Sequence, residues 1–528
     1  MAFTSRSPSL TEHSGGASAI ESHSIEHIPF AERHGKLWQQ GPFWFLGNFQ
    51  PFTLAIGFIG PALGLSLGWT VLASALGLVL GTFFMAFHAS QGPQLGLPQM
   101  IQSRAQFGYR GVIVTLGATL FTFVGFNVVD TIIIDGGLES VFGWNATAVG
   151  IGIAIISVVL AIYGHDWLHR AFRVLFWLSA PCWLVLTAGI LTGRVTGPAE
   201  AAPQAAGAGF TMVAFMVQFT ATASYNITYA PYVSDYSRYL PRSTRTSHIV
   251  GSVFWGAVGS PLWLIPIGAW MAVTLGVSDP LAGIRDAGDQ VVGGLGSVLT
   301  ILSVLALVAT MGLNAYSGAL TVLTGIDSVR PMRPGRSSRI LTISGLGVVW
   351  CVLGTVVISD FSTALSNALL LMLYLLVPWT AVNLVDYFYV RRGHYAITHL
   401  FRPDGIYGAW AWRGLVSYVA GLVLMTPFMV LSFFTGPVAK ALGGVDVAFL
   451  AGLAVSGGLY YVLTRGLDVA AEGPAVAASE RELAGGALTV SAQGGEPSGE
   501  RPGFQPDFGG RTAVGELPAV DGLPTGDR

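Results

Sequence analysis

Charged residues are scarce in this 528-residue chain, of which Asp, Glu, Lys and Arg make up 10%. An ordinary soluble protein has roughly a quarter of its residues charged. Hydrophobic residues make up 52%, so the composition excludes a soluble protein and indicates that most of the chain lies in lipid. The formal net charge of -2 and the scattered basic residues do not favour nucleic acid as a partner.

Cysteine is almost absent, and so is any sign of a cleaved leader. Cys182 and Cys351 each lie in an apolar run without a nearby His or second Cys, so no disulfide framework, metal site or cofactor is predicted. Residues 1–41 are polar and lack the short apolar core and small-residue cleavage site of a signal peptide. This N-terminal segment is expected to stay in the cytoplasm.

Long apolar runs recur from Phe43 to Tyr461. A helix needs about 20 mainly apolar residues to cross the hydrocarbon. The sequence therefore predicts an all-α membrane domain over residues 42–465 with about twelve transmembrane helices. We place them at 43–65, 70–90, 110–134, 145–163, 170–192, 210–232, 249–275, 296–324, 339–358, 362–389, 413–434 and 446–464. The tail at 466–528, rich in Gly, Pro, Ala and Glu, is predicted to be disordered and cytoplasmic.

The positions of Lys and Arg predict the orientation, because short cytoplasmic loops retain an excess of these residues. With a cytoplasmic amino terminus, the loops expected outside hold only Arg194, Arg285 and Lys440. The remaining basic residues fall in the inside loops or the tails. We therefore predict a multi-pass protein of the cell membrane with both termini in the cytoplasm.

Two of the predicted spans combine polar side chains with helix breakers. The first contains Asn48-Phe49-Gln50-Pro51, and the sixth runs from Thr222 to Pro231 with Asn226 between them. Such residues inside a span usually face a protein-lined cavity. Breaks five spans apart are expected of two inverted repeats of five helices, with the substrate site between them. The alternative is that the prolines are tolerated kinks and the amides merely hold helices together.

Other polar residues also lie within or beside predicted spans. Asn314, among small residues of the eighth span, faces either the cavity or a close helix contact. Asp130 lies either at the outer interface or deeper, beside Phe126, where its carboxylate could bind an N–H group or take up a proton. Asp235 and Arg238, three residues apart after the sixth span, form either a gate or an interface anchor.

Further motifs run along the membrane region. They are Ile25-Glu26-His27-Ile28-Pro29, Trp44 to Asn48, Gly96-Leu97-Pro98-Gln99-Met100, Ser103 to Gly111, Asp235 to Pro241, Asn314 to Leu320, and Asp386-Tyr387-Phe388. With these motifs, about residues 20–465 resemble the purine-cytosine permease branch of the nucleobase-cation symporter-1 family. The resemblance implies a leucine-transporter-like fold, with ten helices in two inverted repeats plus two more.

The resemblance also implies a site in which the ring of the solute lies between aromatic side chains of the third and sixth helices. Amides from the first and eighth helices would bind the polar edge of that ring. Matched residue by residue, this substrate site comprises Gln50, Phe126, Asp130, Thr228, Tyr229 and Asn314.

This sequence departs from the family pattern in two ways. Where the family commonly has Gly-Trp in the third and sixth helices, this chain has Gly125-Phe126 and Thr228-Tyr229, and the smaller aromatics could admit a different ring. Sodium-coupled members use hydroxyls of the eighth helix, which Val308 and Ala309 replace here, with carbonyls matched by Leu46 and Phe49. The resemblance therefore favours H⁺, taken up through Asp130, over Na⁺ as the coupling ion.

The leading prediction is a secondary active symporter that imports a nucleobase, most simply cytosine or a purine. The alternative solutes are allantoin, hydantoin and thiamine-like rings. A membrane-embedded enzyme would need a catalytic cluster, and the spans contain only lone candidate residues. A channel would usually need a repeated pore lining or a charged ring. The expected partners are a small heterocycle and the lipid bilayer, and the sequence does not indicate the oligomeric state.

Overall fold

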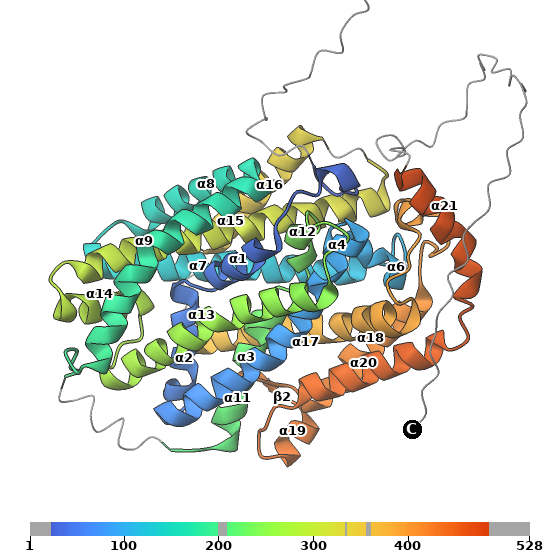
Figure 1. The fold of residues 1–528 in the computed structure, drawn as a ribbon. Helices are drawn as coiled ribbons and strands as arrows, with labels where there is room; N and C mark the ends of the chain where they lie inside the picture. Colours follow the sequence, from blue (N-terminus) through green and yellow to red (C-terminus); the bar gives the residue numbers. More distant parts are fainter. Residues whose placement is uncertain (1–22, 199–208, 333–334, 355–360, 485–528) are drawn as a thin grey trace, which may run out of the picture. The chain divides into compact units, whose positions relative to one another are not determined.

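A computed structural model describes residues 23–198, 209–332, 335–354 and 361–484 of the chain (Figure 1). Within these residues, eight helices are long and apolar enough to cross a membrane. They are α3 (Leu67–Ala89), α7 (Ile113–Phe142), α8 (Ala146–Tyr163), α9 (His165–Leu191), α13 (Thr246–Thr274), α15 (Leu295–Val329), α16 (Arg336–Gly354) and α17 (Phe361–Val385).

The other four predicted spans are shorter or broken helices. They correspond to α1 (Gln40–Gly47) with α2 (Pro51–Ala62), to α11 (Met212–Ile227), to α18 (Trp412–Met425) and to α20 (Ala448–Thr464). The prediction of an all-α membrane protein with about twelve spans is therefore confirmed.

Short elements connect the spans. The helices are η1 (Phe30–Glu32), η2 (Leu37–Gln39), α4 (Gln91–Leu95), α5 (Gln99–Gln102), α6 (Arg104–Phe107), α12 (Val233–Ser237), α14 (Pro280–Val291), the π-helical turn η3 (Asp386–Val390), η4 (Ile397–Phe401), η5 (Thr426–Phe428), α19 (Pro437–Ala441), η6 (Ala470–Glu472) and α21 (Gly473–Ala484). Strands β1 (Val430–Leu431) and β2 (Phe434–Thr435) pair antiparallel, with Val430 opposite Thr435.

Local chemistry explains the break in the first span. Gln50 has an extended backbone, and its side-chain oxygen accepts a hydrogen bond from the N–H of Phe52, 2.6 Å away. Pro51 follows at the first helical position, where its missing N–H costs nothing. A new helix, α2, therefore begins here. In the sixth span, α11 ends at Ile227 and α12 begins only at Val233, with Pro231 in the turn between them. Both predicted breaks are confirmed.

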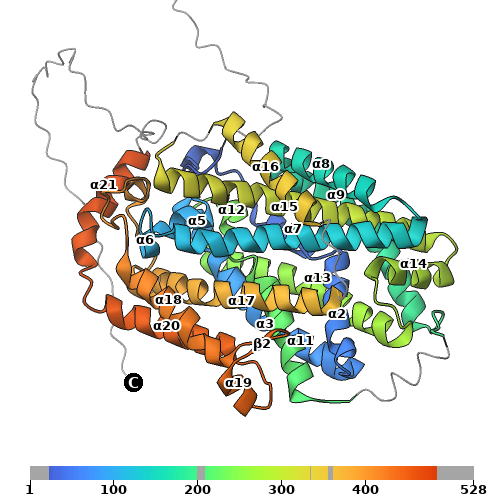
Figure 2. The same cartoon turned by 180° about the vertical axis from the view of Figure 1, so that it is seen from behind.

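The helices pack in two main groups, which Figures 1 and 2 show from opposite sides. One, here named the bundle group, consists of helices that pack mainly on one another: α1, α2, α3, α11, α12 and α13. The other, the frame group, consists of α7, α8, α9, α15 and α16. Helices α17, α18 and α20 form a further layer, in which α17 contacts α11.

The structure corrects the prediction for the tail. Residues 466–484 are not disordered as predicted, because α21 is a helix over Gly473–Ala484. Its composition is too polar to form a core of its own, but Ser479 accepts a hydrogen bond from the backbone N–H of Thr398 at 3.0 Å, so the helix docks on η4. Residues 485–528 lie outside the described residues. The short helix α14, which carries Arg285, Asp286 and Asp289, was not predicted.

Glycines allow α2 and α13 to pack backbone against backbone. A Cβ added at Gly268 would lie 2.1 Å from the carbonyl oxygen of Leu54, and one added at Gly57 would lie 2.4 Å from that of Ile265. Any side chain at these positions must therefore push the two helices apart. This contact holds the second half of the broken first span against the bundle group.

We predict that Gly268→Leu lowers the free energy of unfolding by about 1–3 kcal/mol or more, the usual cost of overpacking. Gly251→Leu on the same helix is the control, because a Cβ at Gly251 meets none of the described residues within 4 Å. Unfolding of the purified protein by titration with sodium dodecyl sulfate measures both. Equal stabilities for the two variants would contradict the contact.

Candidate functional site

The two helix breaks lie against each other and share a pair of amides. Asn48 donates from Nδ2 to Asn226 Oδ1 and to the carbonyl oxygen of Ala257, both at 2.9 Å. Asn226 in turn donates from Nδ2 to Thr82 Oγ1 at 2.5 Å. All these side chains are buried. The two broken spans, 178 residues apart in sequence, are therefore joined directly.

Tyr225 forms a second link between the breaks. Its hydroxyl accepts a hydrogen bond from Gln50 Nε2 at 2.9 Å and lies 2.7 Å from Thr53 Oγ1. Thr53 Oγ1 donates to the carbonyl oxygen of Asn48 at 2.6 Å. Gln50 thus lies at the junction, as predicted, with its amide nitrogen on Tyr225 and its amide oxygen on the start of α2. The sequence analysis did not identify Tyr225.

Two aromatic rings lie near each other beside this junction. The rings of Phe126 on α7 and Tyr229 after α11 are nearly parallel, with an angle of 15° and centroids 6.5 Å apart. Phe52 stacks on Tyr225 at 5.5 Å and meets the ring of Phe126 edge-on at 5.2 Å. A flat ring between Phe126 and Tyr229 would need two contacts of about 3.5–4.0 Å. A small widening of this pair would therefore admit a planar solute.

Asn314 connects the sixth, eighth and third helices. Its Oδ1 accepts a hydrogen bond from the hydroxyl of Tyr232 at 3.0 Å, and its Nδ2 donates to Asn127 Oδ1 at 3.0 Å. Asn127 Nδ2 donates to the carbonyl oxygen of Met311 at 3.1 Å. Asn314 therefore lies in a buried contact between three helices, and its role in a substrate cavity stays a prediction. Tyr232 and Asn127 were not identified from the sequence.

Asp130 is buried, since only 2% of its surface is exposed. It lies one helical turn beyond Phe126 on α7. Within the described part of the chain, its carboxylate has no hydrogen-bond or ion-pair partner. A buried, unpaired carboxylate is costly, so this group favours either a proton or a donor supplied by a solute.

The other predicted substrate residue, Thr228, has a local partner. Its hydroxyl donates to the carbonyl oxygen of Tyr225 at 2.6 Å and thereby helps to end α11. Thr228 is fully buried beside Tyr229. The structure therefore places it at the junction, with its hydroxyl bonded to its own helix.

The positions matched to a sodium site lie at the first break, for Leu46 and Phe49, and on α15, for Val308 and Ala309. The carbonyl of Leu46 accepts from the N–H of Phe49 at 3.1 Å, and the ring of Phe49 packs on Trp183 and Trp263. The carbonyl oxygen of Val308 accepts from Ser157 Oγ at 3.2 Å. Val308 and Ala309 are buried and carry no side-chain oxygen.

The residue after Ala309, Thr310, carries a hydroxyl that lies close to the first break. Its Oγ1 lies 3.2 Å from the carbonyl oxygen of Ala306 on its own helix and 3.4 Å from that of Gly47, and the hydroxyl of Tyr229 donates to the Gly47 oxygen at 3.3 Å. The helix break thus leaves the Gly47 carbonyl to side chains of the sixth and eighth helices.

The predicted gate residues are both buried. Asp235 Oδ1 accepts a hydrogen bond from the backbone N–H of Gln99 at 3.0 Å. Arg238 donates to the carbonyl oxygen of Ser24 at 2.8 Å and to the hydroxyl of Tyr316 at 3.2 Å. Because these side chains are 3% and 0% exposed, the alternative of an exposed interface anchor is wrong. Their action as a gate stays a prediction.

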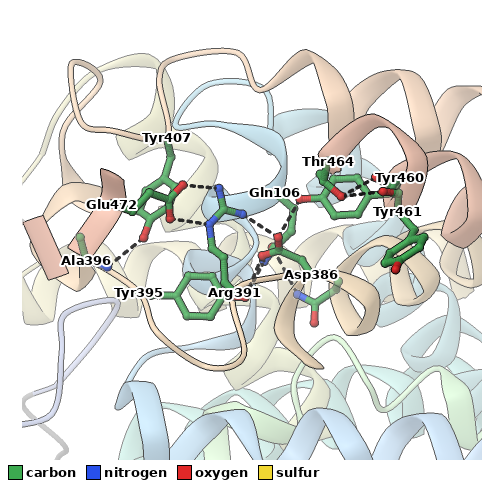
Figure 3. A network of polar contacts seen from close by, with 11 residues as sticks. Gln106, Asp386, Arg391, Tyr395, Ala396, Tyr407, Tyr460, Tyr461, Thr464 and Glu472 are labelled. Carbon is green, nitrogen blue, oxygen red and sulfur yellow. Dashed lines mark hydrogen bonds and ion pairs between the residues drawn. The ribbon is translucent and has the colours of Figure 1, made fainter. Parts of the chain in front are cut away.

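A buried ion-pair network fixes the end of α17 (Figure 3). Four side chains bind the carboxylate of Asp386: Arg391 Nη1 at 2.6 Å, Gln106 Nε2 at 2.7 Å, Tyr395 OH at 2.7 Å and Tyr460 OH at 2.8 Å. Arg391 also donates two hydrogen bonds of 2.9 Å to Glu472, just before α21. The network ties α17, α20, the connector at Gln106 and the tail together, which accounts for the Asp386 motif in structural terms.

Two interrupted helices whose breaks meet in a buried polar junction are characteristic of secondary transporters built from inverted repeats. The chain belongs to the family of permeases for cytosine/purines, uracil, thiamine and allantoin, whose family model matches residues 27–452. It is therefore a multi-pass membrane transporter and not an enzyme.

Known relatives and structures agree with this assignment. The putative purine-cytosine permease YxlA of Bacillus subtilis is 37% identical over 446 residues, which cover 84% of this chain and 96% of YxlA. The purine-cytosine permease fcyB of Emericella nidulans is 24% identical, covering 84% of this chain and 88% of fcyB. Mhp1, a nucleobase-cation-symport-1 family transporter solved closed with bromovinylhydantoin bound, has a TM-score of 0.67 at 20% identity, covering 88% of this chain and 99% of Mhp1. These similarities confirm the predicted family and leucine-transporter-like fold.

We predict that Asn48 and Asn226 stabilise the protein as a unit. Replacing both by Ala should cost less than the sum of the two single replacements, with a coupling energy of about 0.5–3 kcal/mol. Asn48→Ala combined with Asn367→Ala is the control pair, because Asn367 bonds Ser432 in a distant part of the fold. Unfolding by detergent titration measures each cycle, and strict additivity for Asn48 and Asn226 would refute a direct link between the breaks.

Proposed function

We propose that this transporter is a symporter that imports a nucleobase or a closely related heterocycle, with cytosine or a purine as its solute and H⁺ as its coupling ion. The observation that carries the proposal is the parallel pair formed by Phe126 and Tyr229 at the junction of the two helix breaks. A flat aromatic solute fits such a pair better than a sugar or an amino acid does. The names of the relatives support the same solute class.

The polar groups around this pair suit the edge of a base. Gln50 and Asn314 each carry an amide, which can donate and accept, and each is held in place by a tyrosine hydroxyl. Asp130 adds an acceptor on the α7 side. A base presents N–H donors and ring acceptors along one edge, which are the groups that amides and a carboxylate can bond, and its flat faces suit the aromatic rings.

The coupling proposal rests on Asp130. An unpaired buried carboxylate is most stable when protonated or when it accepts from a donor. Protonation from the outside would prepare the site for the solute, and deprotonation toward the cytoplasm would release both. Sodium is less favoured because Val308 and Ala309 supply no oxygen from their side chains.

We further propose that both termini lie in the cytoplasm of a cell membrane. The basic residues of the connecting loops support this orientation, since cytoplasmic loops retain Lys and Arg. Arg238, Arg242 and Arg339 lie on the same side as the N-terminal segment, because Arg238 and Arg339 bond its carbonyls.

The transport experiment uses proteoliposomes with an imposed pH gradient and radiolabelled cytosine. We expect cytosine to accumulate against its gradient, to stop accumulating with a protonophore, and to show no requirement for sodium at fixed pH. Passive equilibration would refute the symporter, and a strict sodium requirement would refute proton coupling. Competition by adenine, hypoxanthine, allantoin, a hydantoin and thiamine distinguishes the other rings.

We predict that Asp130→Asn abolishes proton-driven accumulation but retains cytosine exchange across the membrane, since Asn can bond a base but cannot take up the proton. Asn314→Ala and Gln50→Ala are the comparison variants, and both should weaken accumulation and exchange together. Measuring both cytosine exchange and cytosine accumulation in the same proteoliposomes distinguishes a loss of coupling from a loss of cytosine binding. If Asp130→Asn still concentrates cytosine in response to a pH gradient, Asp130 is not the coupling residue.

A further inference from the structure

Part of the segment of residues 23–35 is buried in the protein although its composition is polar. Ile25 and Ile28 are 3% and 0% exposed, and His27 and Arg33 are also buried. Buried backbone groups need hydrogen-bond partners. The partners of this segment come from several distant parts of the chain, and among them is the predicted gate residue Arg238.

Several of these partners lie on or beside the bundle group. Arg238, directly after α12, donates from Nη1 to the carbonyl oxygen of Ser24 at 2.8 Å. The N–H of Gly35 donates to the carbonyl of Tyr239 at 2.8 Å. The N–H of Ile28 donates to the carbonyl of Gly96 at 2.9 Å, next to α4, which packs on α12. Both ends of the segment are thus tied to the cytoplasmic half of the sixth span.

Another partner belongs to the frame group. Arg339 on α16 is 1% exposed and donates from Nη1 to the carbonyl oxygen of His23 at 2.8 Å. Its Nη2 donates to the carbonyl oxygen of Ile162, at the end of α8, at 3.1 Å. The carbonyls of two consecutive residues, His23 and Ser24, are therefore bound by arginines from the two different helix groups.

Hydrogen bonds of Arg33 hold the backbone of the segment in place between its two attachments. Arg33 donates from Nε to the carbonyl oxygen of Ile28 at 3.0 Å and from Nη1 to that of Pro93 at 2.7 Å. Its Nη2 lies 2.8 Å from His27 Nε2. Burial and the nearby Arg33 lower the pKa of His27 to about 3, so the neutral ring accepts this hydrogen bond.

We propose that residues 23–35 form a strap that ties the bundle group to the frame group on the cytoplasmic side and must release before the site opens to the cytoplasm. This inference rests on the transport cycle proposed above, in which opening to the cytoplasm moves the bundle group away from the frame group, so that a short peptide bound to both must give up one attachment. The contacts are hydrogen bonds to carbonyls near the cytoplasm, where water can replace them. Release is therefore compatible with a reversible transport cycle.

The test places a reporter between the two groups. Ser317 on α15 is fully buried, and its Oγ lies 3.4 Å from the hydroxyl of Tyr236 on α12. In a background with Cys182→Ala and Cys351→Ala, Ser317→Cys should react with a membrane-impermeant maleimide only when the cytoplasmic side opens. Inside-out vesicles expose that side to the reagent.

The strap is loosened by Ile28→Asp, which places a charge at a fully buried position. Ala31→Asp is the matched control, because Ala31 belongs to the same segment and is exposed. We expect Ile28→Asp to raise the rate of labelling at position 317 roughly tenfold, as a minor open state becomes populated, and Ala31→Asp to leave it unchanged. Arg339→Gln, which cuts the frame attachment from the other side, should raise the rate as well.

Unchanged labelling in both Ile28→Asp and Arg339→Gln, with protein that elutes as a single species on gel filtration, would overturn the strap. If Ile28→Asp does not fold, Arg339→Gln decides the question alone. The measurement needs neither the solute nor the coupling ion. A wrong assignment of cytosine or of H⁺ would therefore leave its result intact.

Discussion

The structure depends on the pairing of two broken helices. A helix break inside a membrane leaves backbone N–H and C=O groups that lipid cannot satisfy. Here Asn48 and Asn226 join the two breaks, and side chains of the sixth and eighth helices satisfy the carbonyl of Gly47. These hydrogen bonds form a buried polar junction in an otherwise apolar protein. The candidate site is built on this junction.

The junction also explains why transport by relative movement of helix groups is feasible. The aromatic pair joins α7 of the frame group to the sixth span of the bundle group, so a solute between Phe126 and Tyr229 contacts both groups at once. Asp130 lies on the frame side of the same contact. At the N-terminal segment, the proposed strap links the same two groups through Arg238 and Arg339.

Sequence reasoning predicted the parts of this arrangement that leave a local signal. Pro51 and Pro231 lie close to polar side chains in otherwise apolar spans, and Asn314 stands out in an apolar span. It missed Tyr225, Tyr232 and Asn127, because a tyrosine or amide in a span has no local pattern that tells which side chain it meets. It also did not predict that part of the polar N-terminal segment is buried, and it predicted disorder for all residues after 465. Their folding depends on Arg238, Arg339 and Arg391, which are distant in sequence and supply charge-assisted hydrogen bonds.

The central claim is that the solute binds at the junction of the two breaks. The most direct measurement uses the chain with Cys182→Ala and Cys351→Ala and a single reporter, Thr53→Cys, at the side chain that contacts Tyr225. The account predicts that cytosine slows maleimide labelling at position 53 in a saturable manner, at the concentrations that saturate its uptake. Labelling at the same rate with and without a saturating, transported solute would contradict it.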